Sequence, residues 1–354
     1  MTDFLSKIPK TELVVTVYTL LIGTIGAIIA YYLSFPVFLL TGPALLVSIV
    51  SLIGLPLAIS NNLRDVAFLF IGIGVGSGVN AEAADAFLRW PLAFLVLAIL
   101  LTIALWASQE VLHRVFKFDR RTSILAATPG HLSFVLGLGA SLNADTTKIA
   151  VTQSVRLLAL TISVPFIALL LGIDFNVEIL PAGKPMSAVH VVILVLISVP
   201  FGLLLKYFKV PAGLLIGAMI ISAVSHLSEV TIGPLTPYIA LPCFLIMGTL
   251  IGSRFSGVTF PQLRKFMLAG LLTTTITVSI AVIAALPLAP FLGMPVAHVL
   301  VAFAPGGLET MIAMGAVLGA NPGFVAACHV GRLLILTILV PTFLARYNHK
   351  PPRD

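Results

Sequence analysis

The sequence predicts an all-α polytopic membrane protein, with about ten transmembrane helices and two re-entrant or broken segments in two inverted-topology repeats. Three observations lead to this fold class. Hydrophobic residues make up 59% of the 354 residues and charged residues only 9%, where an ordinary soluble domain carries about a quarter. Apolar runs near the ~20 residues needed to cross a bilayer recur from end to end. The chain also repeats itself at a fixed offset.

Composition and charge favour a single membrane domain over 1–354, because no interval between apolar runs is long enough for a soluble domain. The mean hydropathy is +1.14. The net charge of +7 comes from short basic runs beside the apolar spans, which indicates topology and not nucleic-acid binding. Cys243 and Cys328 lie inside apolar segments, so neither a disulfide framework nor a thiolate metal cluster is expected. The first apolar stretch, 13–33, is longer than a signal-peptide core and is predicted to be the first span.

An internal duplication is visible without gaps. Residues 127–165 align on 303–341 at a constant shift of 176, with identity at 16 of 39 positions. The matches include prolines, glycines and an arginine, which a leucine-rich composition alone would not align. The same shift pairs 68–77 with 244–253. Such a period indicates two copies of one structural unit.

Each copy contains five predicted spans and one interrupted segment between the fourth and the fifth. Repeat 1 covers 11–172 and repeat 2 covers 187–346. The predicted spans are 13–33, 36–56, 63–79, 91–112 and 147–171, followed by 188–207, 211–228, 238–255, 266–288 and 323–345. The interrupted segments are 123–143 and 297–319.

The distribution of Lys and Arg indicates that each interrupted segment enters and leaves on one side of the membrane. If it does, and the N-terminus is cytoplasmic, most basic loops fall inside, with Arg89 and Lys184 as exceptions. If both segments crossed, Lys206 and Lys209 would lie outside. An odd number of spans per repeat then inverts the second repeat, the plan of many secondary transporters. We therefore expect a multi-pass protein of a bacterial-type inner membrane with both termini in the cytoplasm.

Both interrupted segments contain a Pro-Gly break. Proline removes a backbone donor and glycine allows close approach. Inside a bilayer, non-helical backbone is tolerated only where protein or a water-filled cavity satisfies its polar groups. Two packed kinks are the alternative, and the pattern leaves open whether the segments are hairpins or broken spanning helices. The breaks are Thr128-Pro129-Gly130-His131 and Ala304-Pro305-Gly306-Gly307.

The helix after each interrupted segment is predicted to begin at a cap and to carry a buried arginine. Asp145 and Asn321 are the expected N-caps, and Pro322 the first helical residue. Arg156 and Arg332 follow roughly 16 Å beyond the caps, near mid-span. At that depth an arginine faces a partner or a water-filled site. It either holds the carbonyls of the break, with pairing to Glu309 as a variant, or contacts an anionic ligand or coupling ion.

The two copies differ at their polar positions. Glu309 occupies the position of Ser133, and Gly307 that of His131. Glu309 is either a carrier of a proton or cation or the counter-charge of an arginine. His131 and His329 are candidate proton relays, with a purely hydrogen-bonded role as the alternative. The predicted substrate- or ion-binding residues are Pro129, Gly130, His131, Gln153, Arg156, Pro305, Gly306, Gly307, Glu309, Asn321, His329 and Arg332.

Other motifs point to packing and not to catalysis. Gly72-x3-Gly76 and Gly248-x3-Gly252 are small-x3-small patterns that let helices approach closely. No HExxH, Walker or GxSxG context occurs in the sequence. We therefore expect no catalytic residue, no metal and no cofactor.

The segments "TPGHLSFVLGLGASLNAD" and "APGGLETMIAMGAVLGAN", each followed by Arg-Leu-Leu, resemble the signature of the membrane AbrB family over essentially the whole chain. Members carry an AbrB duplication and are labelled AbrB-type transcriptional regulators or ammonia monooxygenases; the first copy departs at His131. The resemblance thus implies gene regulation or an oxidation. Polar groups too scattered for a metal or flavin site argue against an enzyme. Loops too short for a DNA-reading fold argue against direct DNA binding.

Together these observations predict a secondary transporter of a small anionic solute that works by alternating access. The helix N-termini at the breaks and the two arginines would receive the anion. Glu309 would be the coupling site for a proton or cation. The alternative is a membrane protein that influences gene expression by moving or sensing a metabolite. The expected partners are the lipid bilayer, the solute and the coupling ion, without direct nucleic acid, and a homo-oligomer is left open.

Overall fold

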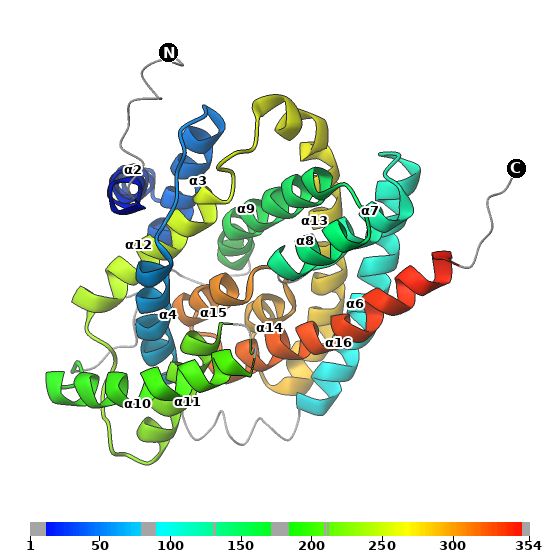
Figure 1. Ribbon diagram of the computed structural model, residues 1–354. Coiled ribbons are helices and arrows are strands. Elements are labelled where there is room, and N and C mark those ends of the chain that lie inside the picture. The colour runs from blue at the N-terminus through cyan, green and yellow to red at the C-terminus, as the bar shows by residue number, and fades with distance from the viewer. Residues whose placement is uncertain are drawn as a thin grey trace, which may run out of the picture. The chain divides into compact units, whose positions relative to one another are not determined.

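The computed structural model describes residues 12–78, 90–129, 132–170, 184–208, 210 and 212–348. Over these residues it contains 14 α-helices and no strand, in agreement with the predicted all-α class (Figure 1). Six helices are long and apolar enough to cross a membrane. They are α2 (Glu12–Tyr32), α6 (Trp90–Arg114), α9 (Thr146–Leu170), α10 (Ala188–Tyr207), α13 (Phe260–Leu292) and α16 (Pro322–Asn348).

Four other predicted spans form helices of 15 to 17 residues. Each is shorter than the ~20 residues that cross a bilayer core. At the N-caps of two of them, Val37 and Ala212 adopt positive φ angles of 51° and 50°. This turn in the backbone delays the helix start beyond the first apolar residue. The four helices are α3 (Phe38–Leu52), α4 (Asn61–Gly76), α11 (Gly213–Leu227) and α12 (Pro237–Ser253).

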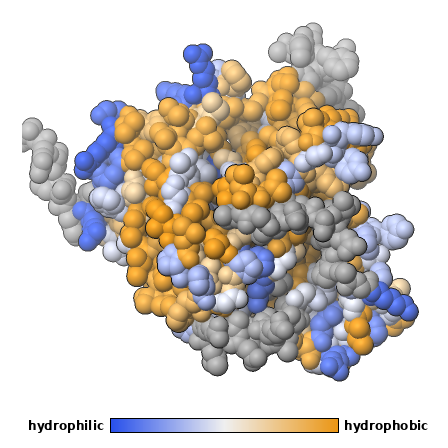
Figure 2. Space-filling view, turned by 180° about the vertical axis from the view of Figure 1, so that it is seen from behind, coloured by the Kyte–Doolittle hydropathy of each residue, from blue (hydrophilic) through white to orange (hydrophobic). Residues whose placement is uncertain are grey.

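Large apolar side chains on the long helices point outward. On α6, Leu95, Ile99, Ile103 and Trp106 are all exposed and recur every three or four residues, so they form one stripe along the helix. Hydrophobic residues cover wide areas of the molecular surface (Figure 2). A soluble protein rarely exposes apolar patches of this kind, and in a bilayer they face lipid. The surface therefore fits a helical membrane protein.

The described helices fall into two compact units that interleave along the chain. The first unit comprises Met1–Ala84, Thr161–Phe260 and Ile312–Gly323. Helix pairs within it pack through glycines, as the small-x3-small patterns predict. A side chain at Gly72 would collide with the carbonyl oxygen of Leu215 in α11, and one at Gly248 would lie 2.6 Å from that of Leu40 in α3. These glycines are needed because backbone approaches backbone there.

The second unit comprises Asp85–Leu160, Pro261–Met311 and Phe324–Asp354. Each interrupted segment folds as a short helix, a break and a second short helix. The break at residue 128 separates α7 from α8, and the break at 304–307 separates α14 from α15. These helices are α7 (Arg120–Ala127), α8 (Leu132–Ser141), α14 (Val296–Phe303) and α15 (Leu308–Val317).

The last helix of each copy, α9 or α16, begins where the predicted cap places it. Asp145 precedes α9, and its Oδ1 accepts a hydrogen bond of 3.0 Å from the Lys148 backbone N–H. Helix α16 begins at Pro322, directly after Asn321. A proline at the first helical position loses no hydrogen bond, because that N–H has no partner within the helix. Both starts follow from local chemistry.

Candidate functional site

The second break is held by Arg332, which is only 2% exposed on α16. Its Nη1 donates to the carbonyl oxygen of Ala304 at 2.9 Å and its Nη2 to that of Gly306 at 2.7 Å. Both carbonyls lie where the chain leaves the helix, and the Ala304 oxygen also accepts from the Gly306 backbone N–H at 2.8 Å. Arg332 therefore helps to satisfy the carbonyls of the break, one of the two roles that the sequence left open.

The first break is held by two side chains of α9. Gln153 Nε2 donates to the carbonyl oxygens of Leu125, Ala126 and Thr128, at 3.2, 3.4 and 2.7 Å. Arg156 Nη2 donates to the Thr128 oxygen at 3.2 Å and also to Gln153 Oε1. At the first break most of these hydrogen bonds thus come from the Gln153 amide, whereas at the second break they come from Arg332. Gln153 and Arg156 are both buried, and so is Pro129. The predicted site residues Gly130 and His131 lie outside the described residues.

Each buried guanidinium keeps one donor without a partner. The Nε atoms of Arg156 and Arg332 are buried and have no hydrogen-bond partner among the described residues. An unpaired donor in an apolar interior costs about 1–3 kcal/mol, and more when it carries charge. The Nε–H and a neighbouring Nη–H form the fork that binds carboxylates in bidentate fashion. Both arginines thus retain capacity for an anionic ligand.

The two breaks belong to one neighbourhood within the second unit. Leu157 of α9, next to Arg156, lies against Gly307, where an added Cβ would be 3.5 Å from its Cδ2. Arg156 and Arg332 are also close enough to act on each other electrostatically. Two like charges in one buried region repel each other, and a negative group placed between them would relieve that repulsion.

Glu309 lies beside the second break without forming a contact ion pair. It is half-buried in the first turn of α15, and its Oε2 is 3.7 Å from the Cβ position of Gly307. It acts on Arg332 electrostatically. Within the described part of the chain, the ion pairs shorter than 4.0 Å include neither Glu309 nor the two arginines. Glu309 is therefore not bound to an arginine as a contact counter-charge.

His329 is fully buried one helical turn before Arg332. Its Nδ1 lies 2.9 Å from the carbonyl oxygen of Val325 in the preceding turn. A hydrogen on Nδ1 donates to that oxygen, so in the neutral ring Nε2 carries the lone pair. The backbone of Ala304, in the break, also interacts with the ring. The imidazole thus lies between its own helix and the second break.

The structure gathers most of the predicted residues but not all of them. Pro305, Gly306, Gly307, Glu309, His329 and Arg332 surround the second break, and Pro129, Gln153 and Arg156 the first. Asn321 falls in the first compact unit, apart from the unit that holds both breaks. Among the residues described, no group of three His, Cys, Asp or Glu side chains could hold a metal ion.

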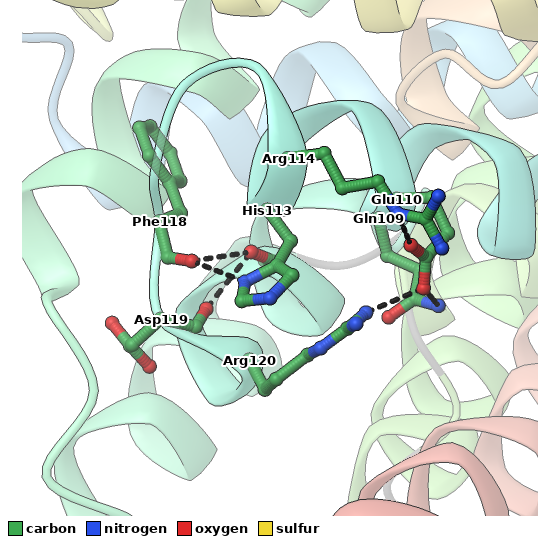
Figure 3. Close-up of polar contacts among 8 residues, drawn as sticks. Gln109, Glu110, His113, Arg114, Phe118, Asp119 and Arg120 are labelled. Atoms are coloured by element: carbon green, nitrogen blue, oxygen red, sulfur yellow. Dashed lines mark hydrogen bonds and ion pairs between the residues drawn. The ribbon is translucent and has the colours of Figure 1, made fainter.

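A polar cluster at the corner between α6 and α7 was not predicted (Figure 3). Glu110 accepts from Arg114 Nε at 2.6 Å and from Arg120 Nη1. The Nδ1 of His113 lies 2.8 Å from the carbonyl oxygen of Phe118 in the intervening turn. The spacing of Glu110 and Arg114 is a helical pair visible in sequence, whereas the link to Arg120 requires the fold. This cluster links the end of α6 to the start of α7, the helix that leads to the first break.

A cavity of about 430 Å³ lies in the first unit, between the turns after α3 and after α12. Ser51, Gly54, Pro56, Ser256 and Phe260 are among its lining residues. None of the substrate- or ion-binding residues predicted from the sequence lines this cavity. The breaks and this cavity are therefore separate features of the chain.

Known sequences match the chain over most of its length. The model of the family described as "Transition state regulatory protein AbrB" matches residues 39–348. The uncharacterized protein YhjN of Bacillus subtilis (strain 168) is 24% identical over 297 residues, which cover 79% of this chain and 77% of the relative. The range that the family model matches includes both breaks and both buried arginines. The chain belongs to the AbrB family.

Proposed function

We propose that this protein is a secondary transporter of a small anionic solute. The observation that supports it most directly is the pair of buried guanidiniums at the breaks. Among the described residues, each has an unpartnered Nε–H and neither forms an ion pair with a carboxylate. Buried charges without a counter-ion are expensive, and inside a membrane they mark ligand or ion pathways by default. An anion from water would supply the missing charge and the missing acceptors.

The backbone around the breaks adds to the attraction for an anion. Helices α8 and α15 begin just after the breaks, and each contains 10 residues. The first N–H groups of a helix have no intrahelical acceptor and carry partial positive charge. Such N-termini bind carboxylates and phosphates in many proteins. The guanidiniums and helix starts together make the region around the breaks positive, which favours an anionic over a neutral solute.

The proposed architecture is two inverted repeats of five spans each, with α3, α4, α11 and α12 as short spans. The contact pattern supports the duplication. Gly72 and Gly76 of α4 meet α11, and Gly248 and Gly252 of α12 meet α3, which is the same contact with the copies exchanged. Both breaks lie in one compact unit. In alternating access that unit is the natural moving body, because it contains both breaks, Glu309 and the two arginines.

Two measurements test the proposal. Thermal unfolding of the purified protein is recorded with a panel of small carboxylates, inorganic phosphate, amines and ammonium, for wild type and Arg332→Lys. A carboxylate or phosphate should stabilise wild type, and lysine should weaken the effect because it lacks the bidentate fork. The stabilising anion is then tested for uptake into liposomes. Binding without flux would instead favour a sensor, the role that the family's description as a regulatory protein suggests.

A further inference from the structure

We infer that Glu309 is a proton-binding site, and that its protonation strengthens the binding of a small carboxylate at Arg156 and Arg332. The solute would then cross the membrane together with a proton. This inference rests on the proposed function and names its coupling ion and substrate class. It follows from the charges around the second break and from the position of Glu309 among them.

Glu309 is placed to compete with a bound anion. It lies in the first turn of α15, where the helix start also attracts negative charge. Among the described residues it forms no ion pair with Arg332, whose Nε–H is left without an acceptor. An ionised Glu309 and an anion held by Arg332 would be like charges in one partly buried region. Each would therefore disfavour the other.

A count of charges shows how a proton changes the site. Arg156 and Arg332 supply two positive charges, and an ionised Glu309 supplies one negative charge, which leaves one net positive charge. A proton on Glu309 leaves both positive charges uncompensated. The site then attracts an anion more strongly. By linkage, a bound anion favours the protonated form of Glu309 to the same degree.

Other titratable groups near the break fit this role less well. Those that act electrostatically on the break are Arg332, His329 and Cys328 on α16 and Arg156 on α9. Charging His329 would add a third positive group to a fully buried region, whereas a proton on Glu309 removes a charge. Glu309 is also half-buried, whereas His329 is fully buried.

The first break lacks an equivalent acid. At the constant shift of 176, the position of Glu309 is Ser133. A serine cannot change charge in the physiological range. Of these two corresponding positions, the one in the second break would therefore carry the proton, while both arginines take part in holding the anion.

The test uses the purified full chain in lipid nanodiscs, with acetate and succinate as the smallest mono- and dicarboxylate probes. Affinity is measured between about pH 5.5 and 8, where acetate remains ionised. In wild type we expect affinity to rise on the order of ten-fold as the pH falls. Glu309→Gln should bind with the low-pH affinity throughout, and Glu309→Asp should restore the pH dependence. Glu229→Gln, which removes an exposed carboxylate from another loop, is the matched control and should behave as wild type.

The outcomes separate this inference from the proposed function. If a probe binds wild type with no pH dependence, or if Glu309→Gln keeps the dependence, the anion site stands and the role of Glu309 is refuted. If neither probe binds wild type at any pH, the anion site itself is refuted and the inference fails with it. A pH dependence that is lost in Glu309→Gln but kept in Glu309→Asp and Glu229→Gln supports both.

Discussion

At the first break, Gln153 donates to three carbonyl oxygens and Arg156 to one of them, whereas at the second break Arg332 alone donates to two. The residue that corresponds to Gln153 is His329, whose Nδ1 donates to Val325 in its own helix. The backbone faces the same difficulty twice, since proline and glycine interrupt a helix among apolar side chains. The side chains that resolve it differ.

The two breaks differ in how much of their hydrogen bonding comes from charged side chains. A glutamine amide satisfies carbonyls without any change of charge, so the described part of the first break is held in one protonation state. At the second break the charged Arg332 donates to the carbonyls, and titratable groups occupy the positions beside it. Glu309 and His329 occupy the positions that Ser133 and Gln153 have in the first copy. Under the proposed coupling, Glu309 of the second copy would be the group that responds to protons.

The largest effect is expected from Arg332→Ala. It removes two charge-assisted hydrogen bonds to buried carbonyls, each worth about 1.5–3 kcal/mol, so the loss should be about 3 kcal/mol or more. Arg156→Ala should cost less, because Gln153 still satisfies the Thr128 carbonyl. Thermal unfolding of both variants in detergent measures the difference. Equal losses would show that the two breaks depend on their arginines alike.

Gln153→Leu tests how far the stability of the first break depends on the glutamine amide. The leucine leaves three carbonyls without the amide donor and Arg156 without its Oε1 acceptor. We expect a loss of about 1–3 kcal/mol, measured as a lower unfolding temperature. His329→Leu is the matched change at the second break and should cost less, because Arg332 still donates to both of its carbonyls. The reverse order would contradict the assignment of the two residues.

Glu110→Gln addresses the corner before the first break, which the second copy lacks. The substitution weakens the ion pairs to Arg114 and Arg120, whose side chains are 75% and 30% exposed. Partly exposed pairs of this kind contribute about 0.2–1 kcal/mol, so a small loss is expected that shrinks at high salt. Unfolding in low and high salt measures it. A loss that does not depend on salt would point to packing instead.

The smallest effect concerns the caps that follow the breaks. Burial raises the pKa of Asp145, but hydrogen bonds from the Lys148 backbone and its ammonium group outweigh it, so the pKa is lowered. A lowered folded-state pKa means that the stabilisation is present above the unfolded value and is lost as pH falls through the folded one. Asp145→Asn should therefore cost about 0.5 kcal/mol at neutral pH, since the side chain is 40% exposed, and nothing in acid. Unfolding of both proteins against pH checks this, and a constant difference would refute it.

The sequence by itself determined the helical membrane class, the position of both breaks and the helix starts at Asp145 and Pro322. These features depend on composition, on local backbone chemistry and on hydrogen bonds to residues three positions away. The same reasoning put an arginine at mid-span, where it must find a partner.

Only the tertiary structure decided which partner each polar group found. Arg332 bonds to carbonyls 26 and 28 residues away, and Arg156 to one 28 residues away. Glu309 is left without a contact ion pair, and Arg120 joins Glu110 across a turn. Such contacts depend on how separate helices pack and on the direction of long side chains, which no local pattern encodes. For that reason the sequence could name the residues of the site but not assign them to holding the backbone or meeting a ligand.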